Sequence, residues 1–196
     1  MKYTEIIDRV KSILDEQTPF DSGLLIDTVE KPINVLISAC LYPAWREVVM
    51  AAPLQLLPVS TLVGSEGVSS LSTPIDYIRF VSMSSDAWAN SVNVYYEPTS
   101  REAEKQRYTH LAATASKPIV VSDAGSFKGF PVMTGTKKLT MRYVASVVFD
   151  EDSASDIMTE YIGDAFCYNV AALVYAILGQ KAIHDIIIEK RDALLS

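Results

Sequence analysis

Histidine and cysteine, the side chains that most often hold metals or act as nucleophiles, are nearly missing from this sequence. Each occurs only twice among 196 residues. Cys40 and Cys167 lie far apart in apolar, helical patterns, which favours two buried free thiols over a disulfide or a metal pair. His110 and His184 fall among polar residues and are expected at the surface. The cysteines and histidines therefore give no indication of redox chemistry, a metal centre or a cofactor.

Long basic runs and long apolar runs are missing as well. The chain has 17 Lys and Arg against 24 Asp and Glu, a net charge of −7 and a pI near 4.8. Its longest basic clusters are the pairs Lys137-Lys138 and Lys190-Arg191, too short to displace the counterions of a nucleic acid. Apolar runs stay short of a membrane span, and acids interrupt the N-terminal residues where a signal peptide needs an apolar run. We expect no specific nucleic-acid binding, no membrane partner, and synthesis in a cytoplasm.

Familiar catalytic motifs do not occur: the sequence has no GxSxG nucleophile elbow, no HExxH or CxxC pattern and no P-loop. Carboxylates are the remaining candidates for chemistry. Asp150, Glu151 and Asp152, with Asp156 nearby, could hold a divalent cation, although acids are also favoured just before a helix. One alternative function is therefore a small metal-dependent hydrolase or nuclease that uses this cluster and Asp76. Our first expectation is a protein without enzymatic activity.

What the sequence does contain at both ends is helical periodicity. The spacing of apolar residues predicts helices over residues 3–16, from 27 or 28 to 52, over 155–179, and over 180–195. Pro43 lies inside the second pattern and should kink that helix or divide it in two.

The third predicted helix is apolar nearly all round and must be covered on more than one side. It carries an aliphatic stripe, which we expect to pack against the N-terminal helices, and a tyrosine stripe, which we expect at a boundary because each hydroxyl needs a polar partner. The first stripe consists of Ile162, Phe166, Val170, Leu173 and Ile177, and the second of Tyr161, Tyr168 and Tyr175.

Between residues 53 and 153 the pattern changes to short β-rich runs separated by turns, with the clearest alternation from Leu139 to Val147. One further helix is predicted over residues 100–113. We therefore predict an α+β fold with terminal helices forming a bundle and a β-rich, antiparallel, sandwich-like middle containing one short helix. The chain is expected to be a single domain, 1–196, in which 1–52 and 154–196 form a helical body and 53–153 a β-rich insertion.

Aromatic residues stand out more than charges in the β-rich middle and in the third helix. Tyrosine and tryptophan are favoured at subunit interfaces, where one side is apolar and the other wet. They also suit a second alternative, a monomeric β-sandwich that binds a ligand. As a predicted assembly interface we select Trp88, Tyr95, Tyr96, Tyr161, Tyr168 and Tyr175.

The order of four segments between residues 73 and 179 resembles that of a known protein family. A turn and strand at residues 73–79 (Thr-Pro-Ile-Asp-Tyr-Ile-Arg) is followed by Trp88, then by a strand beginning Lys-Pro-Ile-Val at residues 117–120, and finally by an apolar helix from Asp164 to Gly179. This order is similar to that of the small head-to-tail connector proteins of tailed bacteriophages, in particular the portal adaptors of podovirus-like and crAss-like phages.

The resemblance implies a structural virion protein, made in the host cytoplasm, that forms a ring joining the portal to the tail. Such rings are commonly homo-oligomers of twelve copies that contact the portal protein on one side and the next tail or collar protein on the other. Genomic DNA passes through the lumen, the DNA ejection channel, without specific binding. The acidic composition agrees with this expectation, because an acidic lumen lets DNA slide without adhering.

Overall fold

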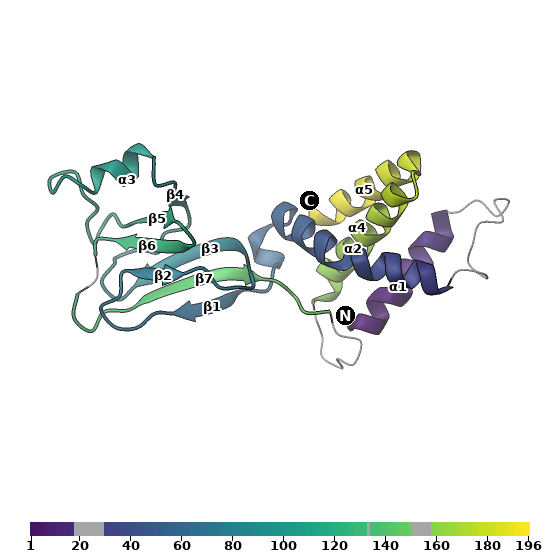
Figure 1. Ribbon diagram of the computed structural model, residues 1–196, viewed down its shortest axis with the longest axis horizontal. Coiled ribbons are helices and arrows are strands. Elements are labelled where there is room, and N and C mark those ends of the chain that lie inside the picture. The colour runs from purple at the N-terminus through teal and green to yellow at the C-terminus, as the bar shows by residue number, and fades with distance from the viewer. Residues whose placement is uncertain (18–29, 133, 150–157) are drawn as a thin grey trace. The chain divides into compact units, whose positions relative to one another are not determined.

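The computed structural model describes residues 1–17, 30–132, 134–149 and 158–196 (Figure 1). The fold is mixed α+β, as predicted, with helices towards both ends of the chain and two sheets between them. Its residues group into two compact units. Met1–Leu57 and Ser146–Ser196 form the helical unit, and Pro58–Ala145 form the β unit.

These two units correspond to the body and the insertion expected at 1–52 with 154–196 and at 53–153, with the boundaries displaced. No described helix has the length and apolar character needed to cross a membrane. The acidic cluster from Asp150 to Asp152, Asp156, and the expected helix start at Ser155 lie outside the described residues.

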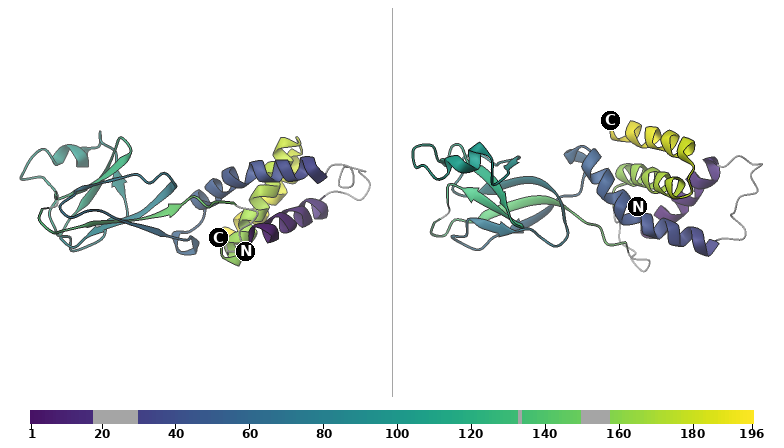
Figure 2. Two further views of the ribbon diagram at one scale, coloured as in Figure 1. Left: turned by 60° about the horizontal axis from the view of Figure 1, so that its bottom comes forward. Right: turned by 45° about the horizontal axis from the view of Figure 1, so that its top comes forward.

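The helical unit contains α1 (Tyr3–Gln17), α2 (Glu30–Ala51), the short 3-10 helix η1 (Leu54–Leu56), α4 (Glu160–Ile177) and α5 (Lys181–Leu195). Helix α4 is its centre, because α1, α2 and α5 all pack against it (Figure 2). This three-sided cover explains why α4 is apolar nearly all round, as its sequence predicts. Among the fully buried side chains, Trp45 of α2 and Phe166 of α4 meet edge to face, with ring centroids 6.0 Å apart.

Gly179 and Pro43 are the residues that the sequence predicts to end or interrupt a helix. Gly179 follows the end of α4 with φ +74°, the left-handed conformation expected of a glycine that terminates a helix. The prediction of a break at Pro43 is wrong in its stronger form, because α2 runs through this residue without division. Pro43 and Ala39, whose carbonyl loses its helical partner, are both exposed, so water can bind that carbonyl.

The β unit contains β1 (Ser60–Val63), β2 (Ser70–Ser72), β3 (Tyr77–Ser85), β4 (Tyr95–Tyr96), α3 (Arg101–Lys105), β5 (Ile119–Asp123), β6 (Ser126–Phe130) and β7 (Leu139–Ala145). One sheet has the order β1-β7-β3 and the other the order β2-β6-β5-β4. All pairs are antiparallel except β4 with β5, which is parallel and corrects the expectation of a wholly antiparallel middle.

The alternation predicted from Leu139 to Val147 is found only in part. Leu139, Met141 and Tyr143 are buried on the inner face of β7, but Val144 is buried as well, and the strand ends at Ala145. The helix predicted over 100–113 is also too long, since α3 ends at Lys105 and turns follow it. Gln106 contributes to that end, because its side chain bonds the backbone of Glu102 and of Ala113 and draws the chain back.

A closed turn leads into β3, as the segment at residues 73–79 suggests. The Tyr77 amide donates to the Pro74 carbonyl over 3.1 Å, and β3 begins at Tyr77. The Asp76 carboxylate accepts a hydrogen bond from the Tyr143 hydroxyl of β7 over 3.1 Å, so it ties the start of β3 to the neighbouring strand.

Candidate functional site

Two of the six residues predicted for an assembly interface lie in the interior of their own unit. Trp88 is 8% exposed and belongs to the core of the β unit, where its ring lies on the backbone of Gly129. Tyr175 is 3% exposed, and its hydroxyl donates to the Leu14 carbonyl over 2.7 Å. Both side chains are therefore buried within their own unit, because the indole covers a glycine and the hydroxyl donates to a carbonyl, and their assignment to an assembly interface stays a prediction.

The other four residues divide between the two units. Tyr95 and Tyr96 form β4, an outer strand of the second sheet, and Tyr95 is 38% exposed. Tyr168 is half-buried on α4, and the side chain of Tyr161 is outside the described part of the structure. The tyrosines of β4 belong to the β unit and Tyr168 to the helical unit. The assignment of these tyrosines to a subunit interface stays a prediction.

Tyr95 belongs to an aromatic cluster in the β unit with Tyr77, Phe80, Phe127 and Tyr143. Ring centroids lie 5.5 Å apart for Phe80 and Tyr95, 5.4 Å for Tyr95 and Phe127, and 5.5 Å for Tyr77 and Phe127. These separations suit the attraction between the edge of one ring and the face of another. The cluster is buried on its core side, where Phe127 is 4% exposed, and reaches solvent at Tyr95.

The hydroxyl groups of Tyr77 and Tyr143 are poor candidates for acid–base chemistry near neutral pH. Burial, and to a smaller extent the neighbouring Tyr95, raises the pKa of Tyr77 to about 12. Burial also raises the pKa of Tyr143, and the Asp76 carboxylate that accepts its hydrogen bond raises it further. A general base or nucleophile needs a lowered pKa instead. Asp76 therefore has a structural partner here, and no three His, Cys, Asp or Glu among the described residues are grouped to hold a metal ion.

The helical unit exposes apolar side chains along the outer side of α2. Val35, Tyr42 and Met50 are 67%, 52% and 60% exposed. With the exposed residues Ala39 and Arg46 they recur at intervals of three or four residues and so lie on one face of the helix. We call these five residues the α2 stripe.

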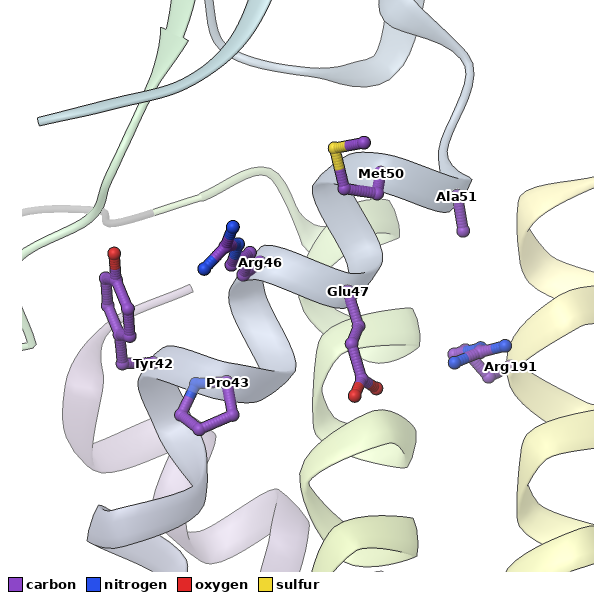
Figure 3. Close-up of a pocket in the computed structure, with 7 residues that line it drawn as sticks. All are labelled: Tyr42, Pro43, Arg46, Glu47, Met50, Ala51 and Arg191. Atoms are coloured by element: carbon purple, nitrogen blue, oxygen red, sulfur yellow. The ribbon is translucent and has the colours of Figure 1, made fainter.

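A groove of about 690 Å³ adjoins this stripe and is lined by Tyr42, Pro43, Arg46, Glu47, Met50, Ala51 and Arg191. Figure 3 shows Glu47 reaching from α2 and Arg191 from α5 towards the space above α4, whereas Tyr42 and Arg46 project from the other side of α2. The buried Asn169 of α4 joins the first two. Its amide nitrogen donates to Glu47 over 2.9 Å, and its oxygen accepts from Arg191 over 2.7 Å. These polar groups bind one another and hold three helices together.

A second set of exposed apolar side chains lies on the hairpin of α4 and α5. Ile177, Leu178 and Ile186 are 60%, 46% and 48% exposed, and we call them the hairpin group. Ile177 was expected to pack against the N-terminal helices with the rest of its stripe, and for this residue the expectation is wrong. The contact of Tyr175 with Leu14 lies near the end of α1 at Gln17, so little of α1 is left to cover Ile177.

Neither the α2 stripe nor the hairpin group was selected from the sequence. The sequence signal for the α2 stripe was that α2 has apolar residues on two sides. Ile37 and Leu41 belong to its buried face, whereas Val35 and Tyr42 lie away from that face. That pattern reveals a second apolar face only after the first one has been assigned to a partner.

The chain was also compared with known proteins. No family model matches it, and no curated protein is detectably similar to it.

Proposed function

We propose that this chain is a structural subunit of the ring that joins the portal to the tail in a tailed bacteriophage, and that it has no catalytic role. The order of the segments from residue 73 to Gly179 supports the family, and the exposed surface of the helical unit supports the ring. In this proposal the helical unit forms the ring body around the DNA channel, and the β unit contacts neighbours or the next tail component.

The observation that carries the proposal is the presence of two sets of exposed apolar side chains on the helical unit. The α2 stripe and the hairpin group lie on different helices and contain large side chains, including Val35, Tyr42 and Ile177. A subunit of a closed ring meets two neighbours through two unlike surfaces, because each contact joins one surface to the other surface of the next copy. Two apolar surfaces on one body provide what such a contact requires.

The charge of the helical unit agrees with a channel lining. This unit contains eight Lys and Arg against 17 Asp and Glu, a net charge of −9, whereas the β unit contains nine against seven, a net charge of +2. An acidic ring body repels the DNA phosphates and so allows passage without adhesion.

The test is ring assembly in the presence of the portal protein of the same phage, followed by negative-stain electron microscopy and native mass spectrometry. We expect the unmodified chain to form a closed ring on the portal. Tyr42→Glu and Ile177→Glu, each of which adds a charge to one apolar surface, should both abolish ring closure while leaving the fold intact, since both side chains are exposed.

Thr4→Glu is the matched control, because Thr4 is an exposed residue of α1 and belongs to neither surface. It should assemble like the unmodified chain, and helical circular dichroism should be equal for all four proteins. A chain that stays monomeric with the portal at every concentration would contradict the ring. Full assembly of both Glu variants would show that the two surfaces are not the ring contacts.

A further inference from the structure

The first strand of the β unit is an open sheet edge. β1 pairs with β7 on one side, and no strand of the described chain pairs with its other side. In Figure 1 it is the outermost strand of its sheet. The other outer strand of this sheet, β3, is partly closed, because Met83 and Val92 exchange two backbone hydrogen bonds of 2.8 Å.

The hydrogen-bond pattern shows which groups of β1 face the open side. The Gly64 amide donates to the Leu139 carbonyl over 2.8 Å, and the register places Leu62 opposite Met141 and Ser60 opposite Tyr143. Because hydrogen-bonded and non-hydrogen-bonded pairs alternate in an antiparallel ladder, the amides and carbonyls of Thr61 and Val63 point away from β7. No described residue forms a backbone hydrogen bond with either of them.

Apart from its short length, this edge has none of the features that usually prevent a sheet from adding another strand. β1 contains no proline and no charged residue, and its register with β7 is continuous. Charges, prolines and bulges are the common protections of an edge. Thr61 is exposed, and Val63 is 57% exposed, so side chains of the same unit do not cover the edge either.

We propose that β1 binds β1 of a second copy of this chain in an antiparallel, two-fold symmetric pair. In one register, Leu62 lies opposite Leu62 of the second copy, and the two-fold axis passes between them. Thr61 of the first copy then lies opposite Val63 of the second, and Val63 of the first lies opposite Thr61 of the second. Both pairs are then of the hydrogen-bonded kind, so the outward amides and carbonyls of Thr61 and Val63 all find partners. The strand is self-complementary in this register.

The side chains agree with the same register. Leu62 is only partly buried against the hydrophobic core of the β unit, and the second Leu62 would cover it on the same face of the joined sheet. On the other face, Thr61 meets Val63 of the second copy, a pair of β-branched side chains that suits a sheet. No like charges meet, because β1 contains none.

The contact uses the β unit, whereas the proposed ring contacts use the helical unit, so the two proposals can fail separately. Since the paired segment is only four residues long, we expect a weak dimer that forms as the concentration rises. The first measurement is sedimentation velocity of the intact chain without portal over a concentration series. The second is amide hydrogen exchange at Thr61 and Val63, which should slow about tenfold from the dilute to the dimeric state.

Variants at the edge test the strand pairing itself. Thr61→Pro removes an outward amide and should abolish both the dimer and the protection of Val63, whereas Thr61→Ala keeps the amide and should dimerise like the unmodified chain. Val63→Lys provides a second test that leaves the backbone donors in place and adds a charge at an exposed position. Tyr42→Glu, on the α2 stripe, should leave this dimer unchanged.

A chain that sediments as a monomer at every concentration, with unchanged exchange at Thr61 and Val63, would overturn the proposal. A dimer that persists in both Thr61→Pro and Val63→Lys would overturn it too, since another surface would then hold the copies together. If Thr61→Pro changes the circular dichroism spectrum, Val63→Lys alone decides the outcome.

Discussion

The thiols of Cys40 and Cys167 lie in the core of the helical unit, where they are 3% and 0% exposed. Burial raises the pKa of both thiols. Asp164 raises the pKa of Cys167 further, though by less than burial does, and this pKa reaches about 12. We expect a thiol reagent at pH 8 to label neither cysteine in the folded chain and both in denaturant, because the reactive thiolate is almost missing. Timed labelling followed by mass spectrometry measures this.

The same shift gives the direction of a pH effect on stability. Above the ordinary thiol pKa of 9.0, the unfolded chain releases protons that the folded chain keeps. This contribution to the free energy of unfolding is complete below pH 9 and decreases as the pH rises from there towards 12. Rapid labelling of Cys167 in the folded chain at pH 8, with labelling of a denatured sample as reference, would contradict its burial.

Tyr175 shows how one hydroxyl can reverse a prediction. Its place on a tyrosine stripe indicated a boundary, because a buried hydroxyl needs a partner. The partner is the carbonyl of Leu14, which lies in the last turn of α1. Periodicity identified the stripe, but only the packing of α1 against α4 shows that a backbone carbonyl lies opposite this residue.

At the scale of elements, Asn169 connects three helices. It is 0% exposed, and besides binding Glu47 and Arg191 it donates to the Ala44 carbonyl over 3.1 Å. We expect Asn169→Leu to lower the free energy of unfolding by about 1–3 kcal/mol, since the hydrogen bonds from α4 to α2 and α5 are lost at nearly constant volume. Urea denaturation followed by circular dichroism measures the change.

Glu47→Gln serves as the control for this change. It keeps a side-chain oxygen that accepts from Asn169, and because Glu47 is exposed we expect an effect within about 0.5 kcal/mol. Equal stability of Asn169→Leu and the unmodified chain would mean that the packing of α4 alone determines how α2 and α5 are held.

The helices and the strands of this chain also differ in how well the sequence predicts them. The long helices were predicted with ends within five residues of those observed, because their cores repeat every three or four residues over many turns. Strand pairing was not predictable in this way: the parallel contact of β4 with β5 joins Tyr95 to Val120, which are far apart in the chain. Of the candidate site, the sequence indicated the aromatic residues but not the exposed apolar face of α2, because both faces of that helix are apolar.

For the whole molecule, charge is divided unequally between the helical unit, at −9, and the β unit, at +2. If the helical units form the ring body, neighbouring copies repel each other there. We therefore expect raised salt to promote ring closure on the portal, because the Debye length falls from about 10 Å at 0.1 M to about 3 Å at 1 M. Native mass spectrometry or electron microscopy across a salt series measures the fraction of closed rings.

The strand-paired dimer is the internal reference for that experiment, because β1 carries no charge and its contact should respond much less to salt. A ring that dissociates as salt rises would mean that attraction between unlike charges holds the copies together, and would contradict contacts made mainly by the apolar surfaces.

The division of the helical unit between the two ends of the chain determines an order of events on the ribosome. Residues 58–145 are contiguous, so the β unit is complete when Ala145 has emerged, whereas α1 and α2 must wait for α4. At synthesis rates of about 5–20 residues per second, the delay between the end of α2 and the end of α4 is about 6–25 seconds. During that time the faces of α1 and α2 that contain Ile6 and Trp45 have no α4 to cover them, and in the last part of it, after Ala145 has emerged, they stay uncovered beside a complete β unit.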